Sequence, residues 1–132
     1  MSTATRSRAS VSKAYTTTQT GDAVVTPSAV TRIKVRKVVG SVGGTTAGTF
    51  ILWFSEHAST PTTDTSYTAG TDKQIVFLRF EADAVPMLQP RMFDIDFPED
   101  VWSQSTARGV PLRVTTSANL TVDFTVYYDV VP

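Results

Sequence analysis

The stretch NLTVDFTVYYDVV, residues 119–131, decides the fold class. Its residues alternate between an apolar set and a mainly polar set: Leu120, Val122, Phe124, Val126, Tyr128 and Val130 against Thr121, Asp123, Thr125, Tyr127 and Asp129. Alternation with a period of two predicts a strand that is buried on one face and solvated on the other. Such half-buried strands are typical of antiparallel sheets, because parallel sheets are covered on both faces.

The same reasoning predicts further strands over 13–18, 30–39, 49–57, 73–81, 91–97 and 110–116. In residues 30–39, Ile33, Val35 and Val39 are expected on one side, opposite the cations Arg32, Lys34 and Arg36. The run 49–57 is apolar on both faces, so it is either central or meets another subunit. Trp53 in this run is therefore assigned to the core or to a contact between copies.

Turns and composition agree with an all-β fold. The chain has 22 Thr and 17 Val but only five Leu, three Glu and four Lys, and β-branched residues suit pleated surfaces. Thr20-Gly21-Asp22 is expected to turn, and the glycine-rich residues 40–48, the long segment 58–72 and the segment 98–108 are expected to be loops, the last with one helical turn after Pro98. We predict an antiparallel β-sandwich, jelly-roll or Ig-like, with about seven or eight strands over residues 21–132.

The charge is distributed unevenly along the chain. Residues 1–37 carry seven basic groups and one acid, a net charge of +6, and residues 38–132 carry a net charge of −6. Residues 1–20 are predicted to form an extended N-terminal arm that becomes ordered only by binding, because its first twelve residues have little to bury. The cations expected to contact a partner are Arg6, Arg8, Lys13, Arg32, Lys34 and Arg36.

Several classes of protein are disfavoured by the sequence. The 132-residue chain has no cysteine, which excludes disulfides and thiolate metal sites, and its polar start does not resemble a secretory signal. No apolar run approaches the ~20 residues that a membrane span needs, so we expect no membrane partner and a soluble protein in the cytoplasm of its producing cell.

The candidate catalytic and metal-binding groups have simpler explanations. Asp94, Asp96, Glu99 and Asp100 could bind calcium or act in glycoside hydrolysis, but no calcium-loop pattern or deep cleft accompanies them. His57 shares a strand face with Ser55 only because of the period of two. We therefore predict no catalytic residue, no cofactor and no metal.

Protein docking explains the cations better than nucleic acid does. Single-strand recognition usually places aromatic side chains among the cations, and Tyr15 is the one aromatic residue near them. We therefore do not expect nucleic acid as a partner. Trp102, in the segment 98–108, is the better candidate for an exposed aromatic residue at an interface.

The segments Val30–Val39, Gly109–Thr116 and Leu120–Tyr128 carry a resemblance. They resemble small β-sandwich structural proteins of tailed-bacteriophage virions, notably head decoration (cement) proteins. The resemblance implies a non-enzymatic protein that binds the major capsid protein on the outer surface of the head, often as a trimer or dimer, and stabilises the shell. The alternatives are a tail, neck or fibre module that binds a host glycan or another virion protein, and a small hydrolase.

Overall fold

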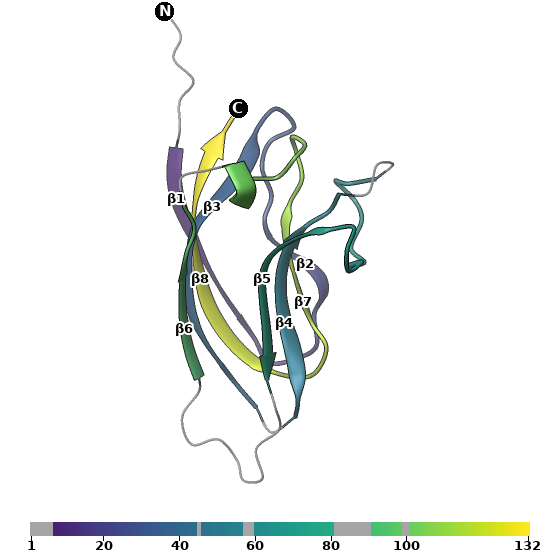
Figure 1. Cartoon of the computed structure of the whole chain (residues 1–132), viewed down its shortest axis with the longest axis vertical. Helices are drawn as coiled ribbons and strands as arrows, with labels where there is room; N and C mark the ends of the chain where they lie inside the picture. Colours follow the sequence, from purple (N-terminus) through teal and green to yellow (C-terminus); the bar gives the residue numbers. More distant parts are fainter. Residues whose placement is uncertain (1–6, 45, 57–59, 81–90, 99–100) are drawn as a thin grey trace, which may run out of the picture.

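The computed structural model describes residues 7–44, 46–56, 60–80, 91–98 and 101–132, and they form two antiparallel four-stranded sheets that pack face to face (Figure 1). The elements are β1 (Ser7–Tyr15), β2 (Thr20–Val25), β3 (Arg32–Gly43), β4 (Gly48–Phe54), β5 (Lys73–Phe80), β6 (Arg91–Asp96), the single-turn 3₁₀-helix η1 (Val101–Ser103), β7 (Leu112–Thr116) and β8 (Thr121–Val131). The predicted antiparallel sandwich is confirmed.

Sheet A has the strand order β1-β8-β3-β6, and sheet B has the order β2-β7-β4-β5. The outermost pairings are nested: β1 pairs with β8, β2 with β7, β3 with β6 and β4 with β5. Two further pairings, β3 with β8 and β4 with β7, complete the sheets. The chain therefore changes sheets repeatedly, and strands distant in sequence become neighbours.

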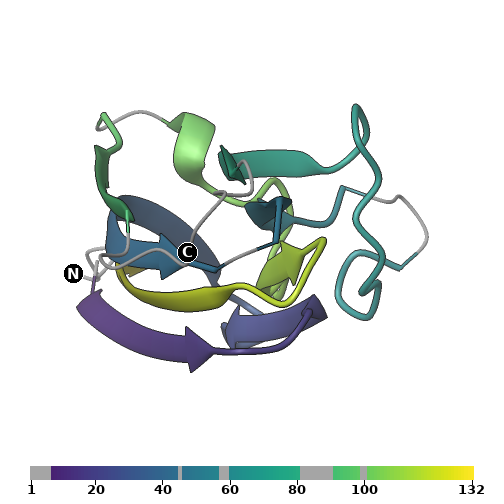
Figure 2. The same ribbon diagram turned by 90° about the horizontal axis from the view of Figure 1, so that it is seen from below.

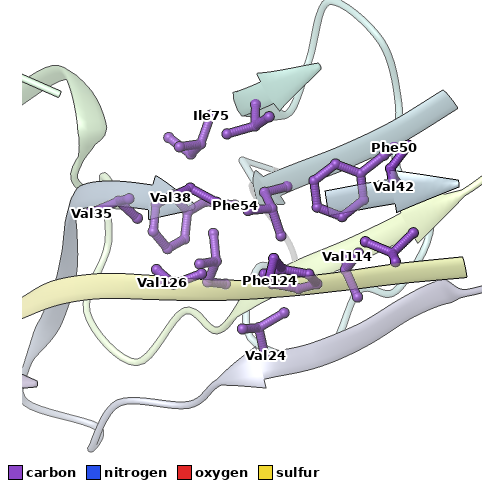
Figure 3. Close-up of a cluster of buried hydrophobic side chains, with 14 of the residues drawn as sticks. Val24, Val35, Val38, Val42, Phe50, Phe54, Ile75, Val114, Phe124 and Val126 are labelled. Atoms are coloured by element: carbon purple, nitrogen blue, oxygen red, sulfur yellow. The ribbon is translucent and has the colours of Figure 1, made fainter. Parts of the chain in front are cut away.

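The core lies between the sheets, where the inward side chains of both meet (Figure 3). The predicted alternation in β8 is confirmed, because Val122, Phe124 and Val126 are buried whereas Thr121 and Asp123 are exposed. Phe124 meets Phe50 of sheet B edge to face, with ring centroids 5.2 Å apart. Burial of these apolar side chains, each worth about 1.5–3 kcal/mol, is the main favourable contribution to folding.

Strand β3 departs from the predicted pattern at one point. The register with β8 shifts between Val35 and Lys37, so that one extra residue is inserted there. This bulge moves Val38 into the core and leaves Val39, which was expected inside, on the outer side. The strand also continues to Gly43, through part of the predicted glycine-rich loop.

The predicted N-terminal arm is not confirmed, and residues 7–15 belong to a sheet of the sandwich. They form β1, which pairs with β8 in an unbroken register from Ser7 opposite Val130 to Tyr15 opposite Val122. The reason is that Val11 and Tyr15 recur with the period of a strand and pack against the core. Residues 1–6, including the candidate partner contact Arg6, lie outside the described residues.

The predicted turn at residues 20–22 is part of β2 instead. Gly21 has a φ of 86°, a left-handed value that glycine adopts readily, and the register with β7 shifts at this point. A Cβ at Gly21 would lie 2.1 Å from the backbone oxygen of Thr65. Glycine is therefore required here because another segment passes directly over the strand.

Tyr15 links β1 to β2 and makes stability depend on pH. Its hydroxyl donates a hydrogen bond to Asp22, and burial, together with that bond and the nearby charge, raises the tyrosine pKa. A raised pKa in the folded state gives stability that is complete below about pH 10 and is lost as pH rises further. We expect the free energy of unfolding to fall less between pH 9 and pH 11 in Tyr15→Phe than in the parent, as measured by urea denaturation. An equal fall in both would contradict this role.

Candidate functional site

The part of the outer face of sheet B that holds Trp53 is covered by the chain's own long loop, residues 60–72, which lies outside one end of the sheet (Figure 1). Phe77 on the same face remains 39% exposed. Trp53 on β4 is 0% exposed beneath the loop. Its ring meets Tyr67 of the loop edge to face at 5.6 Å, and its Nε1 donates to Thr115 Oγ1 at 3.0 Å. Of the two predicted roles of Trp53, core residue or contact between copies, this burial favours the first, because the loop covers the outer side of β4 at Trp53.

Buried polar groups attach this loop to the sheet. The Arg113 guanidinium donates to the Gly21 carbonyl at 2.8 Å and to the Thr62 carbonyl at 3.2 Å. Asp72 accepts from the backbone N–H groups of Glu56 and Thr68, at 2.9 and 2.8 Å. These bonds hold the described part of the loop as a fixed cover on sheet B.

The outer face of sheet A has no such cover among the described residues. Its outward side chains combine charged groups with small polar residues, and among the latter Ser12 and Thr125 share a hydrogen bond of 2.7 Å across β1 and β8. Tyr127, 38% exposed, and Met92 are its large exposed apolar side chains. This is the face of the sandwich that is open to a partner.

One end of this face holds a buried carboxylate among cations. Asp129 of β8 is 0% exposed and lies opposite Arg8 of β1 on one side and Lys34 of β3 on the other. Its Oδ1 is 3.0 Å from Arg36 Nε and 3.9 Å from Arg8 Nε. Arg36 is the extra residue at the bulge in β3, and its side chain reaches this carboxylate. We name Asp129, Arg8, Lys34 and Arg36 the charge cluster.

The charge cluster makes Lys34 and Arg36 less available to a partner than the sequence predicted. Lys34 is buried, and Arg36 is partly buried in its ion pair with Asp129. Both were expected to be free for an acidic partner, but a large part of their charge is neutralised within the chain. Three cations against one carboxylate still leave this end of sheet A positive, and Arg8, whose side chain is 66% exposed, is the accessible member.

A second ion group lies further along the same face. Lys37 Nζ is 3.3 Å from Asp94 and 3.7 Å from Asp96, and chiefly the contact with Asp94 raises the lysine pKa. Among the described residues, no three acidic or histidine side chains come together to hold a metal ion. Asp94 and Asp96 pair with a lysine instead, and Glu99 and Asp100 lie outside the described residues.

A shallow hollow opens beside this ion group. Its volume is about 400 Å³, and it is lined by Arg36, Lys37, Val39, Asp94 and Tyr127. An aromatic ring lies there beside groups of both charges. Chemically, the hollow offers one flat apolar surface together with hydrogen-bond donors and acceptors.

The remaining predicted residues are dispersed. Trp102 is 51% exposed, as expected, and stacks on Phe97 at 5.8 Å; its helix η1 lies between the edge strands β6 and β5 (Figure 2). Arg32 and Lys13 are partly buried. His57 lies outside the described residues, and its expected neighbour Ser55 donates to Asp64 at 3.2 Å.

Asp129 was not recognised from the sequence as a candidate site residue. The available signal was that it belongs to the polar set of residues 119–131, in the longest alternating strand. An acid at the end of such a strand can pair with cations of a neighbouring strand, but only the strand order identifies that neighbour as the cation-rich β3.

In the described part of the chain no helix is long and apolar enough to cross a membrane. Comparison with protein-family models, curated proteins and solved structures finds no match.

Proposed function

We propose that this chain is a non-enzymatic structural protein of a bacteriophage virion, which binds the outer surface of the capsid and stabilises the head. Its partners in this proposal are the major capsid protein and further copies of itself. The protein is made in the host cytoplasm and ends on the virion surface. The resemblance of three strand segments to head decoration proteins suggested this role, and the features of the sandwich now support it.

The fold type we propose is a jelly roll rather than an Ig-like sandwich. A jelly roll is a long antiparallel hairpin rolled into two sheets, which pairs the first strand with the last and continues inward. The nested pairings β1–β8, β2–β7, β3–β6 and β4–β5 follow that rule. Jelly rolls occur in viral capsid and lectin domains, so the fold supports the role by analogy only.

One observation carries the proposal: the two outer faces of the sandwich differ. The chain covers the part of the outer face of sheet B around Trp53 with its own loop, but it leaves the outer face of sheet A open, with Tyr127 exposed among charged and polar groups. A sheet face of charged and small polar side chains around an exposed aromatic residue suits docking on another protein. We propose that this face contacts the capsid.

The test is co-sedimentation of the purified chain with capsid shells that lack it. We expect saturable binding, and we expect Tyr127→Glu to weaken it at least tenfold because a charge would be buried at the contact. The matched control is Thr63→Glu, which adds the same charge on the loop that covers sheet B and should bind as the parent does. Absence of binding, or equal binding by both variants, would refute the proposed contact.

A second candidate function is that of a tail or fibre module that binds a host glycan. The hollow of about 400 Å³ beside Tyr127 favours it, because sugars stack on aromatic rings and bond to polar groups around them. A glycan array separates the two functions. Glycan binding that is lost in Tyr127→Ala or Trp102→Ala, together with no binding to capsid shells, would favour the glycan module.

A further inference from the structure

The four edge strands of the sandwich differ in how well they are protected from pairing with another chain. The register of β2 with its neighbour β7 shifts twice, and the register of β5 with its neighbour β4 shifts opposite Leu52 and Trp53. Strand β6 has six residues, of which Arg91, Asp94 and Asp96 are charged. Register shifts, short length and charge all discourage edge pairing.

Strand β1 has the least of this protection. It has nine residues, no proline and a continuous register with β8 from end to end. One of its edges is paired with β8, and among the described residues no strand pairs with the other edge. A long, regular edge of this kind exposes backbone groups that can accept another strand.

We propose that two copies of the chain associate through β1, antiparallel across a two-fold axis at Val11. Val11 is the central residue of Ser7–Tyr15, so this register pairs all nine residues of each copy. It also places outward residues opposite outward residues, because opposing residues of an antiparallel pair lie on the same side of the sheet. Ser10 then lies opposite the second copy's Ser12.

The distribution of charge supports a second copy of the chain as the partner at the free edge of β1. In this register Arg8 lies opposite the second copy's Ala14 and Lys13 lies opposite its Ala9, so no two cations face each other. Ala14 is in turn opposite Asp123 of β8, and Asp123 is exposed on the same outward face. Two strand spacings separate Arg8 from the second copy's Asp123, about 10 Å, and small Ala14 leaves the path clear for their side chains.

The two-fold axis repeats this contact, so each interface holds two Arg8–Asp123 pairs. The exposed member of the charge cluster would thus find its second carboxylate in another copy. The dimer would have one eight-stranded sheet, β6-β3-β8-β1 continued by the same strands in reverse order. The dimer would join the outer faces of sheet A of the two copies into a single surface. The inference of a dimer does not depend on the proposed capsid binding.

The test uses exposed Ser10 and Ser12, whose side chains point away from the core. The S10K/S12K variant places lysine opposite lysine twice across the axis, whereas S10K/S12E places lysine opposite glutamate twice. We expect sedimentation equilibrium to show a dimer for the parent and S10K/S12E, and dimerisation at least about tenfold weaker for S10K/S12K. Both variants lose the same hydrogen bond to Thr125, so this loss cancels in the comparison.

The S10E/S12K variant is the matched control for charge composition. The two-fold axis makes it equivalent to S10K/S12E, so both should dimerise equally, and added salt should restore part of the dimer in S10K/S12K. Equal thermal unfolding of diluted samples would show that the monomer fold is intact. A parent that stays monomeric at every soluble concentration, or variants that dimerise equally, would overturn the β1 interface while leaving capsid binding to its own test.

Discussion

Asp129→Ala is expected to lower the free energy of unfolding by about 3–5 kcal/mol, as measured by urea denaturation at neutral pH. The carboxylate is fully buried, with Arg36 Nε at 3.0 Å and Lys34 opposite it on β3. Removing it leaves partly buried Arg36 without its ion-pair partner, beside the buried Lys34. An uncompensated buried charge destabilises a fold by more than a surface ion pair stabilises it.

Asp123→Ala is the control for this prediction. Asp123 lies on the same face of the same strand but is exposed, so its loss should change the monomer's stability by less than about 0.5 kcal/mol. Measurements at low protein concentration keep dimer contacts out of the comparison. Similar effects of the two substitutions would contradict the account of Asp129 as the centre of the charge cluster.

Trp53→Ala is expected to cost about 3–5 kcal/mol of stability and to release the loop over sheet B. The indole fills the space between β4 and Tyr67, and its N–H is bonded to Thr115. We expect amide hydrogen exchange to accelerate across residues 60–72 more than in the core strands. Phe77→Ala, on the same side of the sheet but 39% exposed, should cost clearly less.

Trp53→Phe separates a covered core residue from a contact between copies. This variant should remain folded, with unchanged oligomeric mass, since the loop isolates Trp53 from other chains. A change in oligomeric mass at unchanged thermal stability would instead support the contact between copies that the sequence left open.

Much of the fold could be predicted because β-strand burial follows a local pattern. In residues 119–131 the apolar set recurs every two positions, and β8 buries Val122, Phe124 and Val126 and partly buries Tyr128 and Val130. The bulge at residues 35–37 could not be predicted, because several β-branched residues follow one another and either Val38 or Val39 could face the core. Likewise, glycine at position 21 suggested a turn, but glycine is needed there because the backbone of Thr65 lies too close for a Cβ atom.

The candidate site was harder to predict because it depends on which strands are neighbours. The cations of β3 were recognised, but their partner Asp129 lies about ninety residues further along the chain, on a strand that only the sheet order places beside them. The burial of Trp53 was equally hard to predict, because it depends on a covering loop whose sequence has no strand pattern. Composition revealed the uneven charge, but folding neutralises part of it.

The central claim is that the chain coats a bacteriophage head, and its copy number and position in purified particles test this most directly. Quantitative mass spectrometry combined with cryo-electron microscopy should find on the order of hundreds of copies per particle, spread over the capsid exterior according to its symmetry. Absence of the chain from the particle, or its restriction to the tail or neck in a dozen copies or so, would contradict the claim.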